Sequence, residues 1–202
     1  MASGRSGSST KNVRNAVIST ARNIIQAEGA DRLSLREIAR RIGYSPAGLY
    51  EYFENKEEIV QAVRLGAQER FNKALGQVPQ SLPLAEYLVQ LGLAYIRFAN
   101  KYPQEFLLLF TYRRGHLDDT AAEQRLARES YALLGDAVER AVKAGEVHER
   151  AGFGVEEIAY GFWALAHGMA MLQVAYQREL SLEFLDADEM ALRAFAHGLK
   201  QA

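Results

Sequence analysis

The sequence contains no cysteine and only 4 prolines among its 202 residues. Without cysteine there is no disulfide framework, no thiol nucleophile and no metal site built from thiolates. The four histidines are scattered and lack the paired spacing of metal ligands, so we expect no metal site and no bound cofactor. No uninterrupted apolar run reaches the roughly 18 residues that a membrane span requires, and the first residues do not form a signal peptide. We therefore expect a cytoplasmic protein without a membrane segment.

The composition is that of a globular protein that can bury a core, with 49% hydrophobic and 24% charged residues. The formal net charge of −1, from 24 basic and 25 acidic residues, argues against a partner bound mainly through its phosphates. The charges are unevenly distributed, however. Residues 1–56 contain nine basic and five acidic side chains, whereas residues 57–202 contain 15 basic and 20 acidic ones. A basic N-terminal part therefore precedes an acidic body.

Apolar residues recur at the three- and four-residue spacing of amphipathic helices along nearly the whole chain. No alternating run predicts a strand, so the expected fold is all-α with about nine helices. We divide the chain into a flexible arm at 1–10, a three-helix domain at 11–56 and a helical body at 57–202. The predicted helices span residues 11–28, 34–42, 45–53, 55–75, 84–101, 103–112, 119–144, 155–178 and 187–200.

The two short helices 34–42 and 45–53 are separated by only two residues, Gly43 and Tyr44. Ser34 is placed to cap the first helix, with Glu37 three residues later as in a capping box, and Ser45 is placed to cap the second. Gly43 tolerates the positive φ that such a tight turn needs. This pattern predicts a helix-turn-helix, whose second helix enters the major groove of DNA.

The outward face of helix 45–53 carries the candidate DNA contacts. Small side chains at Ala47 and Gly48 let the helix backbone approach base edges, tyrosine hydroxyls can donate to phosphates, and Lys56 adds charge at a helix start. Glu51 either accepts a hydrogen bond from cytosine or points away from DNA, and the sequence leaves both open. The candidates from this reasoning are Tyr44, Ser45, Pro46, Ala47, Gly48, Tyr50, Glu51, Tyr52 and Lys56.

Residues 11–60 resemble the DNA-binding domain of the TetR family of transcriptional regulators, and the run RLSLREIARRIGYSPAGLYEYFENKEEIV is similar to that family's helices 2 and 3 and the start of its helix 4. The resemblance implies that Ser34 contacts phosphate, that Tyr50 is the tyrosine of the family's Leu-Tyr pair and that Lys56 is its phosphate-binding lysine. Tyr52 stands where the family often has histidine. Arg36, a basic residue of helix 34–42, completes the set of candidate DNA contacts.

The resemblance also implies a small-molecule cavity in the C-terminal body, and the aromatic residues there suggest an apolar or aromatic effector. Trp163, His167 and Gly168 form a W-x-x-x-H-G run that is similar to the signature of the WHG subgroup of TetR C-terminal domains. The first two are either packed core residues or a polar fixture of the cavity. The candidate cavity residues are Tyr87, Leu91, Tyr95, Phe98, Phe106, Phe110, Tyr131, Trp163 and His167.

Helix 155–178 is apolar nearly all the way round, so we expect it to be covered on more than one side. Small residues form a ridge on one of its faces, and helix 187–200 offers three large apolar side chains. We expect both to pair with a twofold-related copy of the chain. The candidate interface residues are Gly161, Ala164, Gly168, Ala175, Leu192, Phe195 and Leu199.

The sequence therefore predicts a homodimeric DNA-binding regulator, a repressor that binds a palindromic operator and is released by a small molecule. One alternative is a DNA-binding protein that responds to no ligand. Another is a small all-α enzyme, whose paired acids would be Asp118 with Asp119 or Glu156 with Glu157. Both pairs lie at predicted helix starts, where carboxylates stabilise the helix dipole without any catalytic role.

Overall fold

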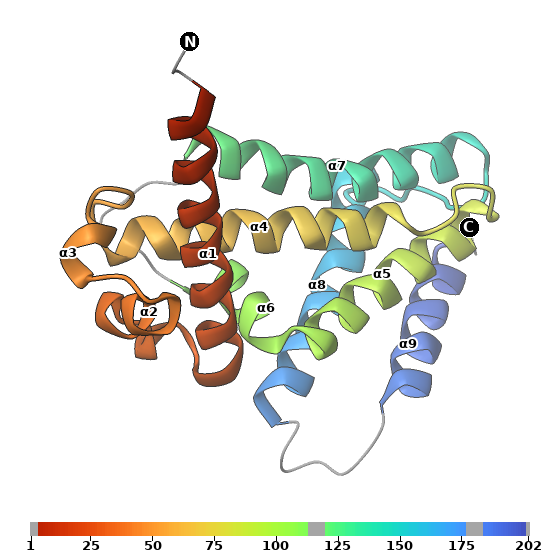
Figure 1. Cartoon of the computed structure of the whole chain (residues 1–202). Coiled ribbons are helices and arrows are strands. Elements are labelled where there is room, and N and C mark those ends of the chain that lie inside the picture. The colour runs from red at the N-terminus through yellow and green to blue at the C-terminus, as the bar shows by residue number, and fades with distance from the viewer. Residues whose placement is uncertain (1–3, 113–119, 177–183, 201–202) are drawn as a thin grey trace. The chain divides into compact units, whose positions relative to one another are not determined.

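The computed structural model describes residues 4–112, 120–176 and 184–200, and within these ranges the chain is helical with no strand (Figure 1). Arg150 and Phe153 form only an isolated antiparallel bridge. The elements are α1 (Gly4–Glu28), the 3-10 turn η1 (Ala30–Arg32), α2 (Leu35–Ile42), α3 (Pro46–Leu49), α4 (Lys56–Gly76), α5 (Leu84–Lys101), α6 (Pro103–Phe110), α7 (Ala121–Lys143), α8 (Val155–Tyr176) and α9 (Leu185–Gly198).

Most observed helix ends agree with the predicted ends within two residues, and two differ more. Helix α1 begins at Gly4, so residues 4–10, which we expected in a flexible arm, form its first turns; no proline precedes Pro46 to interrupt them. Helix α3 ends at Leu49, because the next residues form turns and do not continue the α-helical pattern. The Tyr50 N–H donates to Ala47 O, three residues earlier, at 3.2 Å. The predicted helix start at 119 lies outside the described residues.

The chain divides into two compact units, and the first is built from two separate segments, residues 1–68 and 104–119. Its core gathers buried side chains from α1, α2, α3 and the start of α4, and Leu108 of α6 joins the same cluster. Arg22 of α1 donates to Glu105 of α6 at 2.6 Å, and this carboxylate is fully buried. Helix α6 therefore packs with the helix-turn-helix unit, although its residues lie in the part of the sequence that we assign to the body, 57–202.

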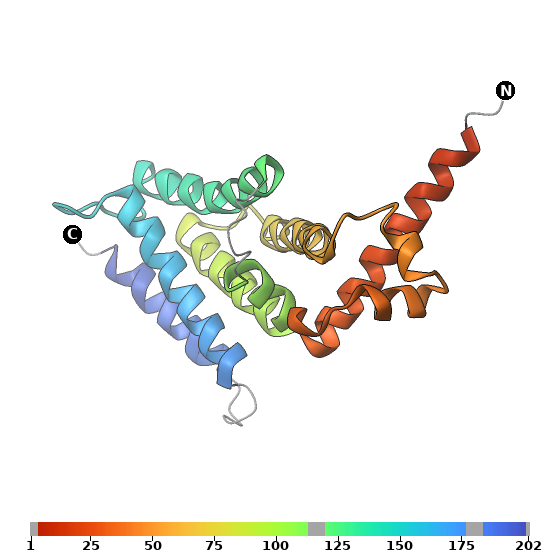
Figure 2. The same cartoon turned by 90° about the vertical axis from the view of Figure 1, so that its left-hand side faces the viewer.

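The second unit contains residues 69–103 and 120–202. Helix α5 lies at its centre and packs against α7, α8 and α9 (Figure 2). Helix α9 lies close to both neighbours, since a Cβ atom at Gly92 would meet Leu192 at 2.9 Å and one at Gly161 would meet Phe195 at 2.6 Å.

The charge also differs between the two units. By sequence, the first unit has 12 basic and 10 acidic residues and the second has 12 basic and 15 acidic ones. This separation of charge is weaker than the split at residue 56 suggests.

Candidate nucleic-acid interface and ligand cavity

Helices α2 and α3 are joined by the tight turn that the sequence predicts. Gly43 adopts the left-handed conformation with φ 71° and ψ 30°, and the Tyr44 N–H donates to Ala39 O at 2.9 Å. The Ser45 hydroxyl accepts from the Gly48 N–H at 3.0 Å and caps α3. Because glycine adopts a positive φ at no steric cost, this residue lets the two helices follow each other directly.

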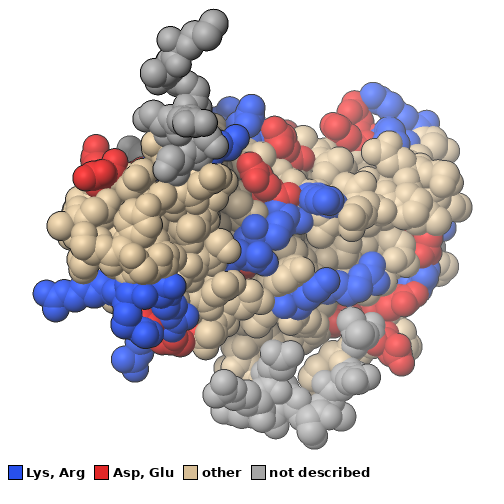
Figure 3. Space-filling model, in the orientation of Figure 1, with Lys and Arg blue, Asp and Glu red and all other residues tan. Residues whose placement is uncertain are grey.

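Glu37 does not complete the capping box that its position predicts. The Ser34 hydroxyl accepts from the Glu37 N–H at 3.2 Å, but the Glu37 carboxylate is held by Arg40 at 2.7 and 2.9 Å and by Arg41 at 2.6 Å. Hydrogen bonds from both arginines, with the larger effect from Arg40, lower the pKa of Glu37 from 4.5 to about 2. The N-terminal cap is therefore one-sided. Figure 3 shows Lys and Arg side chains gathered where α2 lies in Figure 1.

None of the predicted DNA contacts is buried, so all can be reached by a ligand. Tyr52 is the most restrained of them, since its ring packs against the core of the first unit. Gly48 is confined as well, because a Cβ atom there would lie 3.2 Å from the Ser45 hydroxyl. The exposed candidates are Ser34, Arg36, Tyr44, Ser45, Pro46, Ala47, Tyr50 and Glu51, and the half-buried ones are Gly48, Tyr52 and Lys56.

Arg14 positions the end of α3 from outside the motif, and the sequence reasoning missed it. Its guanidinium donates to Tyr52 O at 2.6 Å and to Glu58 at 2.9 Å, and it lies 4.3 Å from the centre of the Phe53 ring. These contacts tie α1 to the segment between α3 and α4. In the sequence, Arg14 is recognisable only as a basic residue one helical turn before the buried Val17. A basic residue at this position also fits a solvated surface side chain, so the sequence does not identify the contact.

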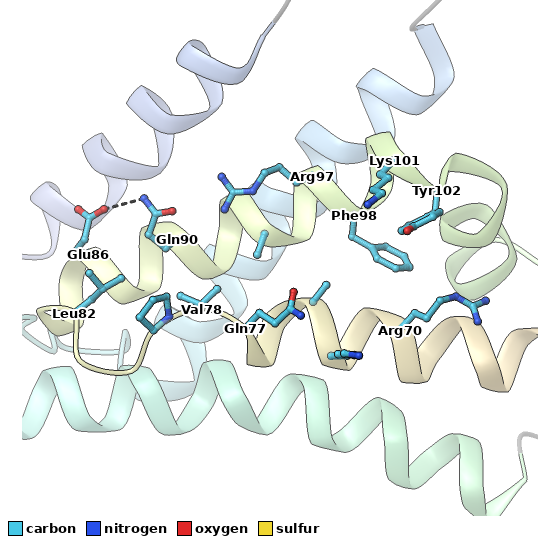
Figure 4. Close-up of a pocket in the computed structure, with 14 residues that line it drawn as sticks. Arg70, Gln77, Val78, Leu82, Glu86, Gln90, Arg97, Phe98, Lys101 and Tyr102 are labelled. Carbon is cyan, nitrogen blue, oxygen red and sulfur yellow. Dashed lines mark hydrogen bonds between the residues drawn. The ribbon is translucent and has the colours of Figure 1, made fainter.

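A cavity of about 650 Å³ lies in the second unit between the C-terminal half of α4 and α5 (Figure 4). Its apolar wall includes Val78, Ala94 and Phe98, all of them buried. Its polar lining is mainly cationic. The charged and polar lining residues are Arg70, Lys73, Gln77, Glu86, Gln90, Arg97, Lys101 and Tyr102.

Phe98 is the only predicted cavity residue that lines this space. Tyr87 and Leu91 face the packed core around α5, where they are buried, and Tyr131 is exposed on α7. Phe106 and Phe110 belong to α6, hence to the first unit, where their rings lie 4.9 Å apart. Aromatic spacing along a helix identifies an apolar stripe but does not distinguish a packed core from a cavity wall. The cavity is distinguished by the cations that line it, which come from two helices.

Tyr95, Trp163 and His167 lie together between α5 and α8, away from that lining, with the Trp163 and His167 ring centres 6.1 Å apart. The Tyr95 hydroxyl lies 2.7 Å from His167 Nδ1. Burial raises the pKa of Tyr95 and a hydrogen bond from Trp163 opposes this, while burial lowers the pKa of His167. Tyr131 meets Trp163 edge-on at 6.1 Å.

The predicted dimer residues fall into two groups. Leu192 and Leu199 are buried within the chain, and Leu192 lies against Gly92 of α5. Gly161 of α8 is covered by Phe195 of α9 in the same chain. The α8 face beside them is open: Ala164 and Ala175 are exposed, and a Cβ atom at Gly168 would meet nothing within 4 Å. Larger apolar side chains flank this face and are exposed as well, namely Tyr160, Leu172, Tyr176 and, on α9, Met190.

Helix α8 is also the one described helix that is long and apolar enough to cross a membrane, with a mean hydropathy of 1.2 over 18 residues. Its sequence contains no uninterrupted apolar run of that length, because His167 and Gln173 lie within it. Length and composition are weak evidence on their own, since a core helix passes the same test. Helix α8 packs against α5, α7 and α9, but only 28% of this apolar stretch is buried, so its open face remains uncovered in the single chain.

No group of metal-binding side chains gathers among the described residues, and His116, Asp118 and Asp119 lie outside them. A helix-turn-helix unit followed by a helical body is the architecture of a DNA-binding transcriptional regulator. The family model of the bacterial regulatory proteins of the tetR family matches residues 17–63, and that of the tetracyclin repressor-like C-terminal domain matches residues 88–198. The chain belongs to the TetR family. Members of this family are transcriptional regulators, so the alternative of a small enzyme is excluded.

Two characterised relatives match the N-terminal part. Over 94 residues the chain is 28% identical to the nucleoid occlusion factor SlmA of Vibrio vulnificus, which covers 44% of this chain and 48% of SlmA. Over 77 residues it is 29% identical to the HTH-type transcriptional regulator UidR of Escherichia coli, covering 38% of this chain and 39% of UidR. The chain thus spans less than half the length of these relatives.

Solved structures share the fold over nearly the whole chain. A protein of unknown function from Rhodococcus sp. RHA1 superposes with a TM-score of 0.81 at 22% identity, covering 94% of this chain and 96% of that one. A tetR-family transcriptional regulator from Streptomyces coelicolor gives 0.67 at 21% identity, covering 93% and 80%. A TetR variant from Acinetobacter baumannii AYE in complex with minocycline gives 0.60 at 17% identity, covering 93% and 96%.

Proposed function

We propose that this chain is a cytoplasmic, homodimeric repressor that binds a palindromic operator through α3 and is released by a small molecule in its second unit. The observation that carries the proposal is the α2–α3 turn at Gly43, followed by a capped α3 whose outer face is exposed from Tyr44 to Glu51. In helix-turn-helix proteins this face enters the major groove. Ser34, Tyr50 and Lys56 are then placed to contact phosphates, while Ala47 and Gly48 are placed near base edges.

The open apolar face of α8 and α9 supports the homodimer. Tyr160 is 60% exposed, Leu172 59% and Met190 71%, and such a cluster of large apolar side chains is unfavourable in water. Ala164 and Gly168 between them leave room for close approach of a second copy. A twofold axis at this face would present two copies of α3 to half-sites whose centres lie about 34–36 Å apart.

The cavity supports an effector and so disfavours the alternative of a DNA-binding protein that responds to no ligand. A ligand releases DNA only if it binds the DNA-free conformation more tightly than the DNA-bound one. The complex of TetR with minocycline is an example of a small molecule bound to a protein of the same fold.

DNA affinity of a single tyrosine variant tests the proposal. Binding to the region upstream of the chain's own gene is measured by fluorescence anisotropy. We expect Tyr50→Phe to weaken binding about threefold to tenfold, because one hydrogen bond to phosphate is lost. Tyr131→Phe, an exposed tyrosine on α7, is the matched control and should leave affinity unchanged. Absence of any specific complex, or equal affinity of both variants, would contradict the proposal.

The dimer is tested by light scattering on the eluting protein. Leu172→Glu should shift the mass from dimer to monomer, since it places a charge in the proposed interface. Ala127→Glu, on the exposed face of α7, should not. A monomeric wild-type protein at micromolar concentration would refute the homodimer.

A further inference from the structure

The cavity between α4 and α5 concentrates positive charge in a unit that is acidic as a whole. The second unit has 12 basic and 15 acidic residues in sequence. Its segment 69–103 contains four basic residues, and all four line the cavity: Arg70, Lys73, Arg97 and Lys101. Glu86 is the only acid in the lining. This local excess of cations is opposite in sign to its surroundings.

The one acid is neutralised from outside the cavity. Arg193 of α9 donates to both carboxylate oxygens of Glu86, at 2.5 and 3.0 Å, and Gln90 donates at 2.9 Å. This ion pair lowers the pKa of Glu86 and keeps the carboxylate engaged with α9. Three of the lining cations, Lys73, Arg97 and Lys101, are exposed and make no ion pair with any described residue. Their charge is therefore available to a ligand.

The lining is also polarised along its length. Figure 4 shows Arg70, Lys101 and Tyr102 at one end and Glu86 with Gln90 at the other. Phe98, Ala94 and Val78 provide the apolar wall between the ends. Lys101 Nζ lies 5.3 Å from the centre of the Tyr102 ring, which directs its ammonium group towards the cationic end. A ligand with one negative group and an apolar tail matches both parts.

We infer that this cavity binds an amphipathic organic anion, with its negative group at Arg97 and Lys101 of α5 and its apolar part along Phe98 and Val78. The inference rests on the proposed effector site and specifies its ligand class. It revises the apolar or aromatic ligand expected from the sequence, because the aromatic side chains behind that expectation mostly pack in the core. An anion forms charge-assisted hydrogen bonds with these exposed cations, and a neutral ligand does not, so we expect the anion to bind more tightly.

Isothermal titration of the full-length protein without DNA tests the inference. The probe is decanoate, compared with decyltrimethylammonium, which has a similar tail and the opposite charge, and with inorganic phosphate, which has no tail. We expect decanoate to bind and the other two to bind at least about tenfold more weakly. The double substitution R97Q/K101Q should weaken decanoate binding at least about tenfold.

The matched control is R125Q/K143Q, which removes two exposed cations of α7 outside the lining and should leave decanoate affinity unchanged. Thermal unfolding checks that both variants fold. No decanoate binding, equal binding of the ammonium probe or of phosphate, or an unaltered R97Q/K101Q would overturn the inference. Decanoate that binds as expected and leaves DNA affinity intact would support the anion site and contradict only the release step of the proposed function.

Discussion

At the scale of single residues, the packing of α9 depends on two glycines on neighbouring helices. Gly92 of α5 faces Leu192, and Gly161 of α8 faces the Phe195 ring. Neither glycine is at a positive φ, so both positions are fixed by space and not by backbone conformation. The Phe195 ring then meets Phe162 edge-on at 4.8 Å.

Gly161→Ala should therefore destabilise the protein by about 1–3 kcal/mol, the usual effect of an added carbon in a filled core. The added Cβ atom is fixed to the backbone of α8, so it can move away from the Phe195 ring only if α8 shifts relative to α9. Gly135→Ala, in the middle of α7 with nothing within 4 Å, is the control and should stabilise by up to about 1 kcal/mol through helix propensity. Urea unfolding followed by circular dichroism measures both, and equal midpoints would contradict the packing described.

Asp188 provides a prediction about pH. It is buried, accepts from Gln173 at 2.6 Å, and desolvation raises its pKa above 3.8. The folded protein then binds this proton more tightly than the unfolded chain does, so the contribution to stability is largest in acid and is lost as pH rises through the raised pKa. Asp188→Asn should stabilise the protein at pH 7 by about 1 kcal/mol. Exposed Asp186→Asn is the control, and a destabilised Asp188→Asn would refute this reading of the site.

At the scale of helices, the ion pair between α1 and α6 holds together segments more than 80 residues apart in sequence. Glu105 is fully buried, and its partner Arg22 is partly exposed. A buried carboxylate is stable only while its partner and hydrogen bonds remain in place. The pair therefore fixes α6 to the helix-turn-helix unit.

Arg22→Ala should cost about 3–5 kcal/mol, because the fully buried Glu105 carboxylate loses the positive charge that it pairs with. Lys143→Ala breaks a pair with Glu139 of the same 2.6 Å length that is exposed on α7, and it should cost less than about 1 kcal/mol. The free energies of unfolding from urea titration decide between them. Similar costs for the two variants would show that burial does not set the strength of these pairs.

Sequence periodicity predicted the helices well, but it did not indicate that α6 packs with the first unit. Stripes such as Val17, Ala21 and Ile24 lie within one element, and the caps at Ser34 and Ser45 are local, so both can be read along the chain. The placement of α6 depends on Arg22 and Leu108 meeting partners far away in sequence. The cationic cavity likewise needs two helices side by side, and no spacing within one helix indicates it.

At the scale of the whole molecule, DNA affinity should depend strongly on salt despite the net charge of −1. The slope of log K against log salt reflects phosphate contacts and not net charge. Lys56→Ala removes one proposed contact and should reduce the magnitude of the slope by about 1. Lys200→Ala, an exposed lysine just beyond α9, should leave it unchanged. A wild-type slope near zero between 50 and 200 mM salt, a range in which about six to ten contacts cost several orders of magnitude, would exclude this interface.

The two-segment construction of the first unit also affects when it can fold during synthesis. Residues 1–68 leave the ribosome first, but Glu105 and Leu108 complete their core and are made only after the next 35 residues or more. At about 5–20 residues per second, synthesis from residue 69 to the end of α6 takes roughly 2–10 seconds, and the core of the DNA-binding unit is incomplete until then. Helix α5 is made during that interval, but its partners α7, α8 and α9 follow α6 in the chain, so the residues that complete the first core are made before those that complete the second.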